Sequence, residues 1–369
     1  MALMKFKTSR ENLLMPLQQV VGVIEKRQTL PILSNVLIRL ADNRLEFTGT
    51  DLEVQLVTHS VTESSEDGEI TVPARKLLDI CRLLPDGSAV NVECRPDKIS
   101  LHSGRSRFSI STLPAENYPA FDVNDPEAEL TLSSKLLKKA MEKTLFAMAL
   151  QDVRYYLNGL LLDLDGRLLR TVASDGHRLA LYEETLDGAE FEPRQVIVPR
   201  KGIMELYRLL SDQDEMVTLQ FSSNNIRVMM GDVSFSAKLI EGRFPDFRRV
   251  MPRDITKVVT VDRETFKSAL TRVSVLTAEK IKGVSLEVKE GLMVLQSQNP
   301  EHEEAEEEFE VRLEGEGLAV GFNTTYLLDA LNNVDSETVT LSFTDAGNSC
   351  LIEDPQNQKY KFIVMPMKL

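Results

Sequence analysis

The stretch VPARKLLDICRLL, residues 72–84, recurs as VPRKGIMELYRLL at residues 198–210 and as GFNTTYLLDAL at residues 321–331. In the first two copies a proline, Pro73 or Pro199, stands at the start of the expected helix. The first turn of a helix tolerates proline because its N–H groups have no intrahelical partner. In the third copy Asn323 can cap the helix with its side-chain oxygen. A pattern that returns at this spacing predicts repeated domains, and it constrains the fold more than any single short motif.

A second amphipathic helix precedes each of these segments. Ser9, Ser133 and Asp262 are capping residues followed by apolar residues at helical spacing. The six expected helices cover residues 10–27, 73–84, 133–150, 199–210, 262–277 and 322–334. Alternating apolar segments, such as residues 98–103, 217–221 and 339–343, lie around the helices and predict half-buried strands.

The sequence therefore predicts an α+β protein of three repeated domains, each with two helices packed on antiparallel sheet. Prolines gather at residues 114–126 and again at 245–252, where linkers are expected. We place the domains at residues 1–127, 128–253 and 254–369. The length of 369 residues is compatible, because roughly 150 residues per domain predicts two or three domains.

The composition argues against several classes of protein. Cys81, Cys94 and Cys350 are odd in number and widely spaced, which favours reduced thiols over a disulfide framework or a thiolate metal site. The four histidines also lack metal-ligand spacing. The chain has neither a signal-peptide core nor an apolar run of about 18 residues. We expect a cytoplasmic protein with no membrane segment, no metal and no cofactor.

The distribution of charge matters more than its total. A formal charge of −14 argues, by itself, against a nucleic-acid partner. The six expected helices nevertheless carry a combined +8, which leaves −22 for the remainder. In the third helix of the chain, Lys135, Lys138, Lys139 and Lys143 are expected on a basic face opposite an apolar one. A basic helical layer suits contacts to DNA phosphates, and the absence of base-reading motifs makes them independent of sequence.

An enzyme is the main alternative from another class. Ser174, Asp175 and His177 offer the residue types of a hydrolase relay, but such residues normally converge from separate segments rather than from one short turn. The chain also lacks a nucleophile-elbow motif, a phosphate-binding loop and a dinucleotide-binding glycine pattern. We therefore expect no catalytic residues.

Several longer runs identify a family. They are TLPIL (29–33), TGTDLE (48–53), VPARK (72–76), GRSRF (104–108), QDVRYYLNG (151–159), SDGHRL (174–179), GRFPD (242–246), Asn299-Pro300 with the glutamate run after it, and VMPM (364–367). In order and spacing they resemble the bacterial DNA polymerase III beta-subunit, or beta-clamp, family over essentially the whole chain.

The resemblance implies a head-to-tail homodimer that closes into a six-domain ring around duplex DNA, with no enzymatic activity. It implies DNA contacts by Arg27, Arg75, Lys76, Gln151, Arg154, Tyr155, Tyr156 and Lys201. Two alternatives stay open here. Arg27 can instead serve the dipole of the helix that it ends, and the two tyrosines can be ordinary strand residues.

The resemblance also implies a pocket for short peptide motifs of partner proteins. Its expected residues are Leu157, Ser174, Gly176, His177, Arg178, Leu179, Pro245, Arg249, Val250, Asn323, Tyr326, Ser349, Ile363, Val364, Met365, Pro366 and Met367. Flexible methionines suit a pocket that accepts different apolar anchors. The alternative for residues 363–367 is a buried final strand.

The resemblance implies that the subunit junction joins the first domain of one copy to the third domain of the other. One side comprises Lys76, Arg105, Arg107, Phe108 and Ile110. The other comprises Val275, Leu276, Glu301, Glu303 and Glu304. Seven of residues 301–310 are glutamates, a density that usually marks a solvated segment but here complements the arginines.

The implied partners are duplex DNA, a second copy of the chain, the DNA polymerase III alpha subunit, the clamp-loader complex, and other polymerases and repair proteins that carry clamp-binding motifs. The implied function is that of a processivity factor near the nucleoid. The alternative is an interaction scaffold that uses the same pocket but does not bind DNA.

Overall fold

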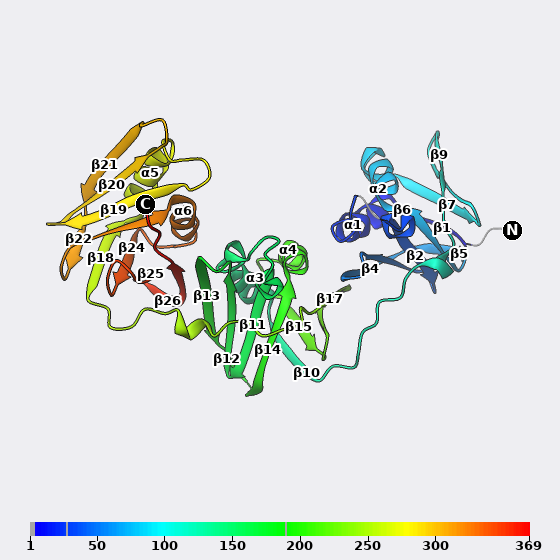
Figure 1. Ribbon diagram of the computed structural model, residues 1–369. Coiled ribbons are helices and arrows are strands. Elements are labelled where there is room, and N and C mark those ends of the chain that lie inside the picture. Colours follow the sequence, from blue (N-terminus) through cyan, green and yellow to red (C-terminus); the bar gives the residue numbers. More distant parts are fainter. Residues whose placement is uncertain (1–3, 27–28, 189) are drawn as a thin grey trace. The chain divides into compact units, whose positions relative to one another are not determined.

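The computed structural model describes residues 4–26, 29–188 and 190–369 (Figure 1). The chain folds into two compact units, each considered separately below. Unit 1 comprises residues 1–138 with 204–239, and unit 2 comprises residues 139–203 with 240–369. The division passes through the second repeat, so that this repeat contributes strands to both units.

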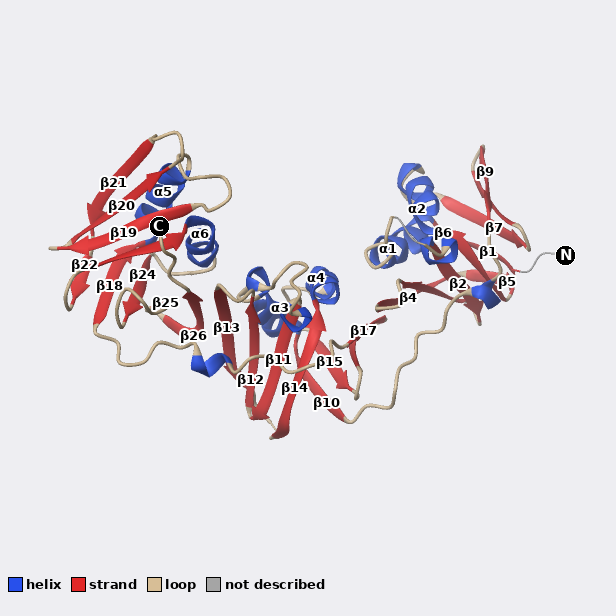
Figure 2. Cartoon of the chain, in the orientation of Figure 1, coloured by secondary structure: helices blue, strands red, loops and turns tan. Residues whose placement is uncertain are grey.

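Six α-helices occur among the described residues (Figure 2). They are α1 (Arg10–Val20), α2 (Ala74–Leu83), α3 (Ser134–Glu142), α4 (Arg200–Leu209), α5 (Arg263–Ser274) and α6 (Thr324–Asn332). The expected caps are formed: Ser9 accepts a hydrogen bond from the backbone of Asn12, Asp262 from that of Thr265, and Asn323 from that of Thr325. The three predicted helix pairs are therefore present.

Two helices end well before the expected residue. The helix predicted over residues 133–150 ends at Glu142, because the buried Thr144 hydroxyl bonds to Ala140 and Thr171 while the chain turns. The backbone of Ala149 then bonds to Leu157 instead of continuing the helix. The helix predicted over residues 10–27 ends at Val20 and is followed by turns. Sequence periodicity continues past both points. Tertiary hydrogen bonds end α3, whereas after α1 the backbone continues in turns, with bonds from Gly22 to Gln19 and from Val23 to Val20.

Unit 1 contains two antiparallel sheets. The five-stranded sheet has the order β5-β1-β7-β8-β9, and the eight-stranded sheet has the order β10-β15-β16-β17-β4-β3-β2-β6. The bounds are β1 (Met4–Ser9), β2 (Asn35–Ala41), β3 (Arg44–Thr50), β4 (Val54–Val61), β5 (Glu63–Glu66), β6 (Gly68–Pro73), β7 (Ala89–Arg95), β8 (Lys98–Ser103), β9 (Ser106–Ser111), β10 (Ala128–Ser133), β15 (Met216–Phe221), β16 (Asn225–Met230) and β17 (Val233–Lys238). Strands of the first and second repeats meet where β4 pairs with β17.

Unit 2 is built in the same way. Its nine-stranded sheet has the order β14-β11-β12-β13-β26-β25-β24-β18-β22, and its four-stranded sheet has the order β21-β20-β19-β23. The bounds are β11 (Gly159–Gly166), β12 (Leu168–Ser174), β13 (Arg178–Thr185), β14 (Phe191–Pro199), β18 (Lys257–Asp262), β19 (Gly283–Lys289), β20 (Leu292–Gln298), β21 (Glu304–Glu310), β22 (Arg312–Glu314), β23 (Leu318–Asn323), β24 (Thr338–Phe343), β25 (Cys350–Asp354) and β26 (Asn357–Val364). The second and third repeats meet where β13 pairs with β26.

The core follows from the alternation of the strands. In β1, β7 and β19 every second side chain is buried, and the apolar faces of the helices cover those sheet faces. Cys81, Cys94 and Cys350 are buried free thiols. Burial raises the pKa of Cys81 and of Cys94 to about 12, which keeps both in the unreactive protonated form. No described helix is both long and apolar enough to cross a membrane.

Candidate functional site

Unit 2 has a cavity of about 210 Å³ beside the junction of β13 and β26. It opens where the last strand of the third repeat meets the sheet of the second. Its lining is mainly apolar and carries a few charged groups. The lining residues are Arg154, Tyr156, Leu157, Ser174, Gly176, Arg178, Leu179, Phe244, Pro245, Asp246, Phe247, Val250, Ile363 and Met365.

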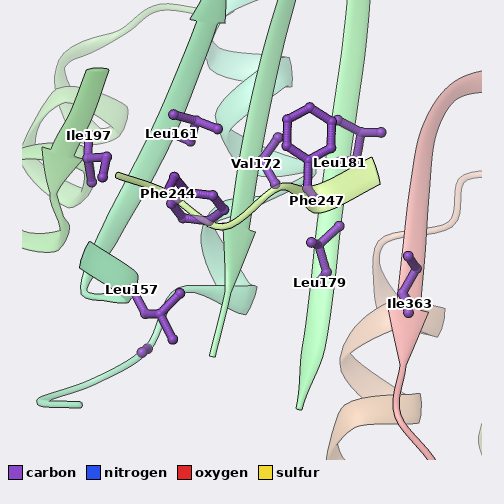
Figure 3. Close-up of a cluster of buried hydrophobic side chains, with 10 residues drawn as sticks. Leu157, Leu161, Val172, Leu179, Leu181, Ile197, Phe244, Phe247 and Ile363 are labelled. Atoms are coloured by element: carbon purple, nitrogen blue, oxygen red, sulfur yellow. The ribbon is translucent and has the colours of Figure 1, made fainter. Parts of the chain in front are cut away.

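The floor of the cavity is part of a buried apolar cluster (Figure 3). Phe244 and Phe247 come from the segment after β17 and lie across β11, β12 and β13, over Leu161 and Val172. Asp246 caps the short 3₁₀ turn that begins at Phe247, by accepting a hydrogen bond from the backbone of Arg248. The linker between two repeats thus supplies part of the site, and its aromatic anchors fix the depth of the cavity.

One wall depends on a glycine. Gly176 has a φ of +89°, and a Cβ at this position would lie 2.6 Å from a guanidinium nitrogen of Arg154. Arg154 itself is held by Asp152 at 2.9 Å and by the carbonyl oxygen of Asp175 at 3.2 Å. The hydrogen bond from Arg154 lowers the pKa of Asp152 to about 2, so this carboxylate stays ionised.

Arg178 connects the cavity to the third repeat. It donates to Asp175 at 3.1 Å within its own turn, to Asp329 of α6, and to the carbonyl oxygen of Phe146 at 3.0 Å. Its guanidinium also lies 4.7 Å from the ring centre of Tyr326. Because this one side chain contacts both repeats, the shape of the cavity depends on how the second and third repeats pack together.

The predicted pocket residues divide into two groups. The cavity itself is lined by Leu157, Ser174, Gly176, Arg178, Leu179, Pro245, Val250, Ile363 and Met365. The others lie nearby: the His177 and Tyr326 rings stack at 6.3 Å, Asn323 caps α6, and the Ser349 hydroxyl donates to Val250. Val364 is buried, Arg249 is exposed, and Pro366 and Met367 follow β26. Ile363 lines the cavity and also belongs to a paired, buried strand, whereas Met365 lines the cavity beyond the end of that strand.

Sequence reasoning missed Phe244, Asp246 and Phe247, although GRFPD was one of the quoted runs. An apolar pair inside a proline-rich linker was the available signal. Arg154 and Tyr156 were expected to contact DNA and are found on the cavity wall.

The remaining predicted DNA residues are mostly accessible. Arg27 lies outside the described residues. Lys76, Gln151 and Tyr155 are exposed, and Lys201 is half-buried. Gln151 has a φ of +55° in an exposed turn. The Arg75 guanidinium donates to the carbonyl oxygen of Ile24, which fixes it against the end of the first helical region.

The prediction of one exposed lysine face on α3 was wrong at Lys143. Its side chain is 2% exposed; it donates to Asp335 at 2.7 Å and to the carbonyl oxygen of Asn333, over the ring of Tyr360. Lys139 also pairs with Asp335, at 3.2 Å. Acceptors from the third repeat, the Asp335 carboxylate and the carbonyl oxygen of Asn333, explain why a lysine that was expected to be solvated is enclosed.

The predicted junction residues lie on or beside two sheet-edge strands. Arg105 and Arg107 are exposed at the start of β9, Phe108 is half-buried and Ile110 is buried. Val275 is 76% exposed just after α5, Leu276 is half-buried, and Glu301, Glu303 and Glu304 are exposed at or before the start of β21. Glu307 of β21 forms an ion pair with Arg272 of the same chain.

The serine, aspartate and histidine of residues 174–177 are engaged in turn structure. Ser174 donates its hydroxyl to the carbonyl oxygen of Arg178 at 2.7 Å, and Asp175 accepts from the backbone of His177. These bonds shape the cavity rim and do not form a proton relay. In the part of the chain that the structure describes, no group of acidic, histidine or cysteine residues has the arrangement of a metal site.

Three α+β repeats, basic helices and an apolar cavity at a repeat junction are the features of a sliding-clamp subunit. The chain belongs to the bacterial DNA polymerase III beta-subunit family: the family's N-terminal, central and C-terminal domains match residues 4–122, 131–246 and 248–368.

Individual relatives agree over the full length. The beta sliding clamp of Haemophilus influenzae is 47% identical over 367 residues, which cover 99% of this chain and all of the relative, and that of Pseudomonas aeruginosa is 46% identical with the same coverage. The crystal structure of the P. aeruginosa clamp bound to griselimycin has a TM-score of 0.95 at 46% identity. The clamp of Bartonella birtlesii bound to griselimycin has a TM-score of 0.94 at 34% identity. Both structures cover 99% of this chain and are covered completely.

Proposed function

We propose that two copies of this chain close head to tail around duplex DNA and tether the replicative polymerase to its template. The protein is a DNA sliding clamp, a processivity factor and not an enzyme. The observation that carries this function is the match of all three family domains along the chain. A closed ring raises the local concentration of a bound polymerase without supplying chemistry. We further propose domain boundaries at 127/128 and 253/254, near the linkers at residues 114–126 and 245–252.

Basic helices support the proposed DNA contact. Each of α2, α3, α4 and α5 has two more basic than acidic residues, although the chain as a whole is acidic. Lys76 of α2 and Lys135 of α3 are exposed. Scattered phosphate contacts of this kind give weak binding that salt reduces, which suits a protein that slides. Arg75, Gln151, Tyr155 and Lys201 complete the proposed contact set, with Arg154 and Tyr156 at its boundary with the cavity.

Exposed apolar side chains support the proposed subunit junction. Leu83 at the end of α2 is 87% exposed and Val275 after α5 is 76% exposed, although both helices are otherwise amphipathic. An apolar side chain left in solvent at a helix end is a candidate anchor for a partner surface. The junction would then be complementary in two ways. Leu83 of one copy would pack against Val275 of the other, and Arg105 and Arg107 would face the glutamates of β21.

The cavity supports the proposed binding of partner segments. Its apolar floor and flexible Met365 suit short apolar motifs, and Arg154 and Arg178 can orient their polar groups. We propose griselimycin, which is bound in the structures of two relatives, as the probe ligand for this cavity. The polymerase III alpha subunit, the clamp loader and other replication or repair proteins would share this pocket. With these partners, the proposed site of action is the cytoplasm, at the nucleoid.

Loading onto plasmid DNA tests the ring. The protein would be assembled with a clamp loader and ATP on nicked circular plasmid, and half of the sample would be linearised. We expect retention on circles and loss from linear DNA in moderate salt, because salt weakens phosphate contacts but not topological linkage. Equal retention on both forms would instead indicate ordinary DNA binding.

A scaffold that does not bind DNA is the alternative. Replacing Arg27 and Gln151 with alanine would leave a scaffold's partner binding intact, whereas clamp loading should fail. Deleting residues 365–369 should abolish polymerase stimulation while the dimer persists. Stimulation retained by the truncated protein would overturn the pocket assignment.

A further inference from the structure

The segment that follows β26 is fixed at two points. The backbone N–H of Met365 donates to the carbonyl oxygen of His177 at 2.9 Å, on the rim of the cavity. The N–H of Met367 donates to Gly321 of β23 at 2.8 Å, in an antiparallel bridge. The segment therefore runs from the cavity wall, where the side chain of Met365 lies, onto the four-stranded sheet of the third repeat.

Two glycines of that sheet make room for the segment. A Cβ on Gly321 would lie 2.6 Å from the carbonyl oxygen of Met367 and 2.8 Å from Cγ of Leu369, and a Cβ on Gly283 would collide with the Leu369 side chain. Neither glycine has a left-handed φ. Glycine weakens a strand unless the backbone needs its freedom or another group needs its space. Here only the second reason applies.

The two glycines form one hollow. Gly283 of β19 lies opposite Asn323, and Gly321 lies opposite Ser285, so the glycines sit on neighbouring strands and on the same face of the sheet. The Leu369 side chain packs against both glycines, beside the exposed Ile281. Leu369 is 67% exposed, so the contact orders the segment more than it adds to the core.

We propose that Leu369 is a positioning residue for the partner pocket: seated over Gly283 and Gly321, it holds residues 365–369 so that Met365 forms a preorganised wall. The inference rests on the proposed pocket function. Met365 is 41% exposed and lies beyond the end of β26, where, among the described residues, its bond to His177 and the bridge at Gly321 hold the backbone. A wall that is already ordered spares a ligand the entropic cost of ordering it.

Calorimetric titration with griselimycin tests the proposal on the full-length protein. Leu369→Ala should weaken griselimycin binding about five- to tenfold, because binding would then have to order residues 365–369, which the unmodified protein already holds in place. Leu369→Met should restore most of the affinity, because it refills the hollow without a charge. Met216→Ala is the matched control, since Met216 is 59% exposed in unit 1 and lies in β15. All variants should keep the dimer mass of the unmodified protein.

Hydrogen exchange provides a second readout that needs no ligand. In Leu369→Ala the amides of Met365 and Met367 should exchange faster, while that of Phe362 within β26 stays unchanged. If the unmodified protein binds griselimycin and Leu369→Ala matches it in affinity and exchange, only the positioning role is overturned. If the unmodified protein does not bind griselimycin, the pocket assignment fails, and with it the role that rests on it.

Discussion

Arg178 shows how one side chain can define a site. It donates to two carboxylates and one carbonyl oxygen and lies against the ring of Tyr326. Arg178→Lys keeps the charge but loses the planar set of donors, so we expect a loss of about 1–3 kcal/mol in ligand affinity, roughly 5- to 150-fold. Titration with griselimycin measures it. Arg312→Lys, the same substitution on β22, is the control, because the side chain of Arg312 is 77% exposed, pairs with Glu314 and does not line the cavity.

At the residue scale, the sequence predicts which side chains carry chemistry better than it predicts their neighbours. Leu157, Gly176, Arg178 and Met365 line the cavity as the family resemblance implied. Phe247 was missed, because a linker aromatic becomes a pocket floor only when tertiary packing folds the linker back over β12 and β13. Periodicity has no information about such packing.

At the level of elements, all six helix starts were predicted within two residues, whereas three of the six ends, those of α1, α3 and α5, lie three to eight residues before the predicted ones. Starts are encoded locally, by Ser9, Asp262 and Asn323, whose side chains satisfy the first free N–H groups. The end of α3 depends instead on Thr144, whose hydroxyl bonds to the distant Thr171. The α+β class and the three helix pairs were therefore accessible from sequence, whereas the enclosure of Lys143 after α3 was not.

Lys143 gives a prediction at this scale. Lys143→Ala removes the closer of the two lysines that pair with Asp335 at the junction of the second and third repeats. We expect a loss of about 3 kcal/mol, at the low end for a broken buried pair because Asp335 is half-exposed and can be hydrated. Calorimetric unfolding should show a lower Tm. Lys138→Ala should cost less than about 0.5 kcal/mol, because its partner Asp212 is 81% exposed. Equal losses would contradict a structural role for Lys143.

The same junction should be sensitive to acid. Burial alone raises the pKa of Asp335, but the hydrogen bond and charge of Lys143, together with Lys139, outweigh it and lower the pKa below its ordinary value of 3.8. The stabilisation is therefore present above that ordinary value and is lost as pH falls through the lowered one. The Tm difference between the unmodified protein and Asp335→Asn should shrink over that acidic window. A difference independent of pH would rule out this linkage.

At the scale of the whole molecule, the repeats make the subunit junction predictable. In unit 1, Ser234 of β17 lies opposite Val57 of β4, and in unit 2, Lys361 of β26 lies opposite Leu181 of β13. Val57 and Leu181 hold the same position in their hairpins, and Glu306 holds that position in β21. Within the described residues β21 ends its sheet unpaired, so a third junction of this kind requires a strand from another copy.

The strand that corresponds to β17 and β26 is β9, also at a sheet edge, and in it Arg107 holds the position of Ser234. The same register therefore places Arg107 of one copy opposite Glu306 of the other, and Arg105 opposite Glu308. Directly opposed charges of this kind stabilise pairing, and like charges disrupt it.

We expect Arg107→Glu or Glu306→Arg alone to weaken the dimer about tenfold or more, and the double variant to recover most of the loss. Sedimentation equilibrium measures this directly. Arg95→Glu, an equal charge change on β7 away from the edge, should leave the dimer unchanged. A double variant as weak as either single one would mean that the third junction does not repeat the register of the other two.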